Sequence, residues 1–227
     1  MMWSLRPMNL ELAETELHNL KQNPQKISQY NEYWSRITPQ TNEAIKRRYV
    51  FSFLSVHTPW SANVTSFLLL DKNKHALSDK EELTELLIKS RAGNHSRKSE
   101  GIFRFVKDFD DNPDFYKLDG AVDHQEKRDK IMAKCYGLGL AKTAFALEMC
   151  FPMTAQVVCL DTHILQLYGH KESKDRARVN YKKYKAMEDH WLNVCKTLDL
   201  APAVARAIWW DKKQQQEDSR YWTYTIE

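Results

Sequence analysis

The sequence predicts an all-α fold, and three observations support that prediction. Apolar residues recur at helical spacing along most of the 227 residues, long alternating runs of β-branched residues are nearly absent, and glycine and proline number only 6 and 7. With 42% hydrophobic residues, a chain of this length can bury one sizeable core or two smaller lobes that share an interface.

Two helices are expected before residue 40. Helical spacing of apolar residues runs through 10–20 and 27–37, and Pro24 separates the two segments. Thr38 or Thr41 can start the next helix, because a threonine hydroxyl accepts a hydrogen bond from an unpaired amide of the first turn.

The third helix is expected to run to Val56, with Pro59 closing it. Ser78 and Glu81 form an S-x-x-E capping box ahead of an apolar helix. Further helices are expected around 102–106, broken at 110–113, then at 123–135, from Leu140 to Pro152, at 181–198, and from Pro202 to about Trp210.

Residues 136–163 hold the most informative pattern, YGLGLAKTAFALEMCFPMTAQVVCLDTH. Gly137, Leu138 and Gly139 predict a sharp turn, because glycine takes backbone angles that a side chain forbids. The turn precedes a helix that starts near Leu140, and the unpaired amides of a helix N-terminus favour an anion such as a phosphate. The turn is therefore a candidate phosphate clamp.

The same segment carries a lysine and an aspartate. Lys142 lies in the first turn of the predicted helix, which Pro152 ends. The apolar run 155–160 then leads to Asp161 and His163, and the aspartate is well placed as an N-cap. Taken alone, Asp161 fits a helix cap as well as a reactive group, and Lys142 fits a solvated helix surface.

A second pattern lies upstream, where residues 53–60 read FLSVHTPW. Together, the two patterns resemble the helix-hairpin-helix (HhH-GPD) DNA glycosylase superfamily, in particular its endonuclease III and 8-oxoguanine glycosylase-like members. The upstream segment resembles the family's LLSxQT helix end, and the downstream segment resembles its hairpin, apolar helix and D-T-H sequence. The resemblance extends from about Tyr49 to Gly169, roughly half of the chain.

The resemblance implies an enzyme that flips a damaged or modified base out of double-stranded DNA and cuts its N-glycosidic bond. Asp161 matches the family's catalytic aspartate, which stabilises the cationic sugar as the base leaves. Bifunctional members add a lysine that forms a Schiff base with the sugar and nicks the strand, and Lys142 is the candidate here.

The chain departs from the family pattern at two positions. Lys142 is the third residue after the second glycine, whereas the family lysine is the second, and Tyr136 replaces the family's proline. One residue rotates a side chain by about 100° around a helix. AP lyase activity therefore depends on whether the hairpin conformation compensates for this offset.

Three alternatives stay open at this point. The chain could be a monofunctional glycosylase that uses Asp161 alone, a non-catalytic helix-hairpin-helix DNA-binding module, or a protein-interaction scaffold. The excised base is open too, because recognition lies in the shape of a pocket. Candidates are oxidised guanine, oxidised pyrimidine, alkylated purine, uracil and a programmed modification.

The resemblance also assigns further site residues. His57 occupies the position from which related enzymes insert a polar side chain into the gap left by the flipped base, although a helix cap or a core group fits it as well. Trp60 and His163 are candidates for the base pocket, and core packing is the alternative for Trp60. The predicted DNA contacts are Gly137, Leu138, Gly139, Leu140, His57 and Thr58.

The resemblance implies a helical fold with two lobes. Residues 41–169 would form the central lobe, with the helix-hairpin-helix at about 124–150 and Asp161 within it, and residues 1–40 and 170–227 would form the other. The four cysteines, Cys135, Cys150, Cys159 and Cys195, lack the close spacing of an iron–sulfur site, so buried free thiols are expected. A monovalent cation at the hairpin is compatible with the resemblance; no other cofactor and no metal is expected.

The net charge of +4 argues little about partners, but its distribution says more. Residues 169–190 carry seven lysines and arginines against four acids, which suits either phosphate contacts or a solvated helix surface. A smaller basic run at 89–98 is expected in a loop, and the aromatic C-terminus is expected to pack onto the body.

The sequence shows no membrane span or signal peptide, so we expect a protein that is cytoplasmic (nucleoid-associated) or nuclear and not secreted. We also expect a monomer.

Overall fold

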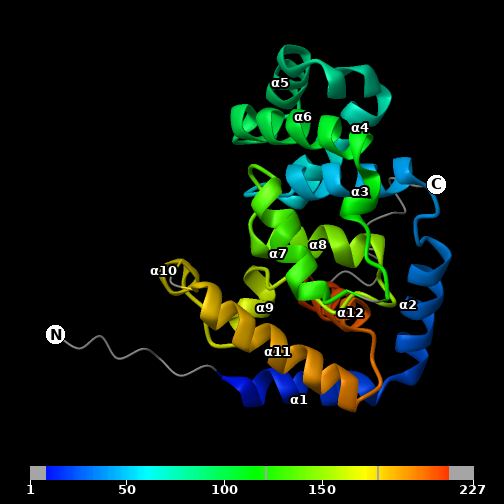
Figure 1. The fold of residues 1–227 in the computed structure, drawn as a ribbon. Helices are drawn as coiled ribbons and strands as arrows, with labels where there is room; N and C mark the ends of the chain where they lie inside the picture. Colours follow the sequence, from blue (N-terminus) through cyan, green and yellow to red (C-terminus); the bar gives the residue numbers. More distant parts are fainter. Residues whose placement is uncertain (1–8, 121, 178, 215–227) are drawn as a thin grey trace. The chain divides into compact units, whose positions relative to one another are not determined.

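The computed structural model describes residues 9–120, 122–177 and 179–214, and the statements below concern those residues (Figure 1). They form two compact units. Unit 1 contains the described residues up to Arg36 and from Pro152 onwards, and unit 2 is Ile37–Phe151. No strand occurs in the described part of the chain, which confirms the predicted all-α class.

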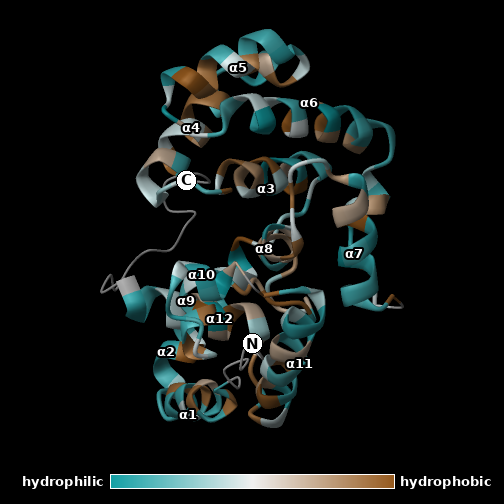
Figure 2. Ribbon diagram, turned by 90° about the vertical axis from the view of Figure 1, so that its left-hand side faces the viewer, coloured by the Kyte–Doolittle hydropathy of each residue, from teal (hydrophilic) through white to brown (hydrophobic). Residues whose placement is uncertain are grey.

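Unit 2 consists of α3 (Asn42–Leu54), α4 (Trp60–Lys72), η1 (Lys74–Ser78), α5 (Lys80–Lys89), α6 (His95–Asp111), η2 (Pro113–Tyr116), α7 (His124–Lys134) and α8 (Leu140–Cys150). Helix α3 packs against α4, α6 and α8, and Figure 2 shows hydrophobic residues along α3 and α8. The ring of Tyr49 stacks on Phe105 at 5.2 Å, and Phe105 meets Tyr116 edge-on at 5.1 Å. Aromatic packing therefore joins α3, α6 and η2 in one core.

Unit 1 consists of α1 (Leu10–Lys21), α2 (Pro24–Arg36), α9 (Thr162–Leu167), α10 (Ser173–Arg176), α11 (Tyr181–Thr197) and α12 (Pro202–Gln214). Helix α1 packs against α2 and α11, and α12 packs against α2, α9 and α11. The hydroxyl of Tyr30 donates to the buried carboxylate of Asp211, and Nε1 of the buried Trp191 donates to the carbonyl of Pro202 at 3.4 Å. These contacts fix α12 in the core of unit 1.

Most expected helix starts are found at the expected caps. Thr41, Asp123 and Asp161 each accept hydrogen bonds from amides of the first turn of α3, α7 and α9. Helix α5 differs by one residue, because Asp79 rather than Ser78 accepts the hydrogen bond from its first turn. Ser78 instead completes η1.

Two stretches differ from the sequence prediction. Pro59 does not close α3, which already ends at Leu54, but is the N-cap position of α4. Helix α6 begins at His95, so Arg97 and Lys98 lie in a helix and not in the expected loop. A left-handed residue at Asn94, φ 52°, turns the chain into this helix.

The unit boundaries differ from the lobes expected from the sequence. Residues 152–169, with Asp161, belong to unit 1, and residues 37–40 belong to unit 2. The reason for the first change is that the extended segment 155–160 is hydrogen-bonded to α11. The amide of Val158 donates to buried Glu188 at 3.0 Å, and the hydroxyl of Tyr184 donates to the carbonyl of Val158 at 2.6 Å.

Two further sequence expectations concern membrane-spanning helices and the C-terminus. None of the described helices has the length and apolarity needed to cross a bilayer. The C-terminal aromatic residues Tyr221, Trp222 and Tyr224, which were expected to pack onto the body, lie outside the described residues.

Candidate functional site

The glycine turn lies between α7 and α8. Gly137 has φ +97°, a conformation that disfavours any side chain, so the expectation for this glycine is confirmed. Gly139 has an ordinary φ of −104°, and an added Cβ would meet nothing within 4 Å. Gly139 is therefore not required by the turn, but it is the N-cap position of α8, whose first amides lack partners within the helix.

Helix α6 lies directly against this hairpin. A Cβ at Gly101 would come within 2.5 Å of the carbonyl oxygen of Tyr136, so only glycine permits this approach. Tyr136 is 47% exposed, and the guanidinium groups of Arg97 and Arg104 lie 5.7 and 5.3 Å from its ring centroid. Two cations thus lie beside the ring of Tyr136 at the hairpin, and one of them, Arg104, also pairs with Glu100.

Lys142 lies in the first turn of α8. Its Nζ is 5.3 Å from the ring centroid of Phe145, and its carbonyl accepts a hydrogen bond from Oγ of Ser52 on α3 at 2.6 Å. The backbone of Lys142 is therefore held by α3.

Trp60 lies beside the aromatic residues of α3 and α8. Its ring packs edge-on against Phe51 at 5.5 Å, and Phe51 in turn lies 6.3 Å from Phe145.

In unit 1, two sets of contacts hold the carboxylate of Asp161. Oδ1 accepts from the amides of His163 at 2.9 Å and Ile164 at 3.1 Å, which caps α9. Oδ2 lies 3.8 Å from Nη1 of Arg206, whose side chain is 3% exposed, whereas that of Asp161 is 17% exposed. The carboxylate is thus fixed in orientation and still reachable from solvent.

Helix α12 supplies the groups around the start of α9. Arg206 and Trp210 are one helical turn apart on α12, and the ring of His163 packs edge-on to Trp210 at 6.3 Å. His163 therefore contacts α12, and its place in a base pocket stays a prediction. Arg206 is not among the predicted site residues, although a lone arginine in the apolar run PAVARAIWW indicates a buried partner.

His57 and Thr58 lie in the turn after α3. His57 is exposed and has φ +49°, which is uncommon for a residue other than glycine. The hydroxyl of Thr58 donates to the carbonyl of Val56 at 3.0 Å and accepts a hydrogen bond from the buried Lys98. The sequence predicted Lys98 to lie in a basic loop, and its burial and its hydrogen bond to Thr58 depend on contacts that the sequence does not show.

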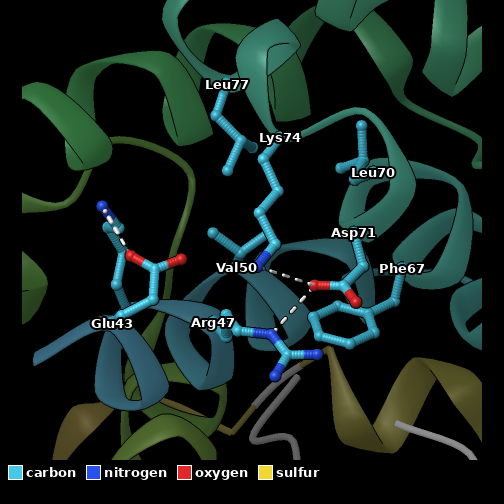
Figure 3. A pocket seen from close by; sticks show the side chains of 9 residues that line it. Glu43, Arg47, Val50, Phe67, Leu70, Asp71, Lys74 and Leu77 are labelled. Carbon is cyan, nitrogen blue, oxygen red and sulfur yellow. Dashed lines mark ion pairs between the residues drawn. The ribbon is translucent and has the colours of Figure 1, made fainter. Parts of the chain in front are cut away.

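A separate pocket lies between α3, α4 and η1 (Figure 3). Phe67, Leu70 and Leu77 are among its apolar lining residues. Its charged groups pair with one another: Arg47 Nε lies 3.0 Å from Oδ1 of Asp71. None of the predicted site residues lines this pocket, so it is not the candidate base pocket.

Metal-binding groups are dispersed in the described chain. The four cysteines are free and buried, and burial raises the pKa of Cys135, Cys150 and Cys195 to about 12. Across the described ranges, no three histidine, cysteine or acidic residues gather to hold a metal ion. Thiols with such raised pKa values are poor metal ligands near neutral pH.

The fold is shared with solved 8-oxoguanine DNA glycosylases. The 8-oxoguanine DNA glycosylase of Thermotoga maritima is 17% identical, with a TM-score of 0.71 over 92% of this chain and 100% of that chain. A second match is the Methanocaldococcus jannaschii 8-oxoguanine glycosylase/lyase in complex with a 15mer DNA containing 8-oxoguanine, which is 15% identical, with a TM-score of 0.71 over 89% of this chain and 97% of that chain. No protein-family model and no curated protein matches the sequence.

Proposed function

We propose that this protein is a DNA glycosylase that flips out and excises a damaged base. The observation that carries the proposal is the carboxylate of Asp161, fixed by the start of α9 and by buried Arg206 in a fold shared with 8-oxoguanine DNA glycosylases. As the N-glycosidic bond breaks, positive charge develops on the sugar. A preoriented carboxylate stabilises that charge without first having to reorganise, which lowers the barrier.

The substrate that we propose is double-stranded DNA containing 8-oxoguanine. Support comes from the similar structures, because the Thermotoga maritima protein is an 8-oxoguanine DNA glycosylase and the Methanocaldococcus jannaschii structure holds DNA with this base. The N-terminus of α8 and the guanidinium groups of Arg97 and Arg104 at the ring of Tyr136 support binding to the phosphate backbone.

AP lyase activity through Lys142 is a second proposal, favoured by the glycosylase/lyase among the similar structures. Neutral Nζ of Lys142 would attack C1′ as the bond to the base breaks, and the departing base would take up a proton. Opening of the sugar ring gives the Schiff base. Loss of a proton from C2′ then breaks the C3′–O bond and nicks the strand.

A lesion panel tests the excision proposal. Duplexes that each carry one lesion are incubated with the protein, and hot alkali then cleaves the strand wherever a base has been removed. We expect cleavage with 8-oxoguanine and none with the undamaged duplex. Intact DNA binding without cleavage of any lesion would instead support a non-catalytic binding module.

Borohydride trapping tests the lyase proposal. The reagent reduces a Schiff base to a stable protein–DNA adduct, so the wild type should form an adduct that Lys142→Ala abolishes. Lys196→Ala, on the exposed surface of α11, is the matched control and should still form it. Excision without trapping would identify a monofunctional glycosylase, and trapping that survives Lys142→Ala would assign the chemistry to another amine.

A further inference from the structure

A buried lysine lies beneath the turn that carries His57. Lys98 of α6 is 3% exposed, and its Nζ donates to the carbonyl of Leu54 at 2.8 Å and to that of Ala92 at 2.6 Å. Its third hydrogen bond goes to Oγ1 of Thr58. An ammonium group has three N–H donors, so this one is fully used. The acceptors come from the end of α3, the turn at residues 55–59 and the turn between α5 and α6.

These contacts fix a backbone conformation that is unfavourable by itself. His57 has φ +49°, and such strain persists only where surrounding contacts hold it. The hydroxyl of Thr58, which accepts a hydrogen bond from Lys98, also donates one to the carbonyl of Val56 at 3.0 Å. These two residues flank His57. On the other side, a Cβ at Gly93 would lie 3.9 Å from the carbonyl oxygen of His57, so the α5–α6 turn borders this peptide.

We propose that Lys98 is a positioning residue that holds the 55–59 turn, and with it exposed His57, in the conformation that engages DNA. The importance of this turn for base excision rests on the proposed function. The dependence of the turn on Lys98 is independent of that function, because it follows from the three hydrogen bonds of Lys98. Lys98 touches no substrate in this scheme and acts through the turn.

The charge state of Lys98 gives a means of testing this arrangement. Burial lowers the pKa of Lys98 to about 8, and the positive charge of Lys142 on α8 acts in the same direction. The groups that meet its Nζ from the other elements are the two carbonyls and the Thr58 hydroxyl. A lowered pKa means that the closed turn accommodates the neutral amine better than the ammonium, compared with a lysine that opening exposes to water, so the closed turn gains stability as the pH rises above about 8.

Hydrogen exchange of the free, full-length protein is the primary experiment. The amide of Val56 donates to the carbonyl of Phe53 at 3.2 Å and reports on the turn. Protection, corrected for the intrinsic effect of pH, should rise in the wild type between about pH 7 and about pH 9.5, because the buried site favours the neutral amine. Lys98→Met should lower it at both values, whereas Lys107→Met, an exposed position on the same helix, should resemble the wild type.

Two further variants keep the test decisive if Lys98→Met does not fold. Thr58→Val removes the hydroxyl that accepts from Lys98 and donates to the carbonyl of Val56, and should reduce protection of Val56 at about pH 7. Lys142→Gln removes the neighbouring positive charge, which raises the pKa of Lys98, and should move the rise in protection to higher pH, a shift that a purely structural lysine would not produce. Unchanged protection across this pH range in the wild type, or no shift in Lys142→Gln, would overturn the proposal.

Excision activity is measured in a separate experiment. With an 8-oxoguanine duplex at saturating protein, Lys98→Met should lower the single-turnover excision rate by about tenfold or more, relative to Lys107→Met. Excision at the wild-type rate by a folded Lys98→Met variant would contradict a positioning role. If the wild type excises no base, the proposed function fails, while the exchange experiment still decides whether Lys98 holds the turn.

Discussion

Nη1 of Arg206 lies 3.8 Å from Oδ2 of Asp161, and the arginine side chain is almost completely buried. The aspartate that the sequence singles out is therefore held by a partner from α12 as well as by the start of α9. Capping α9 engages only Oδ1, so Arg206 decides how the other oxygen is oriented.

We expect Arg206→Met to lower the single-turnover excision rate by about ten- to a hundredfold, because the free oxygen of Asp161 loses its neighbour and the carboxylate can rotate. DNA affinity, measured by fluorescence anisotropy, should change little. Arg206→Lys keeps a positive charge and should recover part of the rate. Equal loss of rate in both variants, with unchanged folding, would show that charge at this position is unimportant.

The two hairpin glycines should respond differently to alanine. Gly137→Ala forces a side chain into φ +97° and should cost about 1–2 kcal/mol of unfolding free energy. Gly139→Ala meets no atom within 4 Å and should leave stability nearly unchanged. Urea unfolding of the two variants measures the difference. Similar stability losses in the two variants would contradict the structure of this turn.

Tyr136 should matter for DNA binding through the arginines that it holds. If Arg97 and Arg104 each contact a phosphate, replacing either by glutamine should weaken binding to all sequences and reduce the slope of log affinity against log salt by about 1. Tyr136→Ala should weaken binding with a smaller change in slope, since both charges remain. A slope unaffected by both arginine substitutions would place the DNA elsewhere.

Lys98 should make stability depend on pH in a defined direction. Its pKa in the folded protein is lowered to about 8 from 10.5, so between these values the unfolded chain binds more protons than the folded protein. The contribution of Lys98 to the free energy of unfolding should therefore rise with pH in this window, by up to about 2 kcal/mol between about pH 8 and pH 9.5. Urea unfolding of wild type and Lys98→Met checks this: their difference should grow with pH. A constant difference would contradict the lowered pKa.

Local patterns explain what the sequence could predict. The glycine turn and the cap at Asp161 each depend on a few neighbouring residues, and both are found as expected. Arg206 and Lys98 escaped prediction because their partners lie far along the chain, so only the folded structure shows that these cations are buried. The place of residues 155–160 in unit 1 could not be read from the sequence for a similar reason, since it depends on hydrogen bonds to α11.

The most direct test of the proposed base excision is the single-turnover rate of Asp161→Asn on a duplex containing 8-oxoguanine. Asp199→Asn is the matched control, because Asp199 is exposed and its left-handed backbone, φ 52°, suits asparagine. We predict that Asp161→Asn still binds the duplex but excises the base at least about a hundredfold more slowly, while Asp199→Asn keeps the wild-type rate. Excision by Asp161→Asn at the wild-type rate would contradict the central claim.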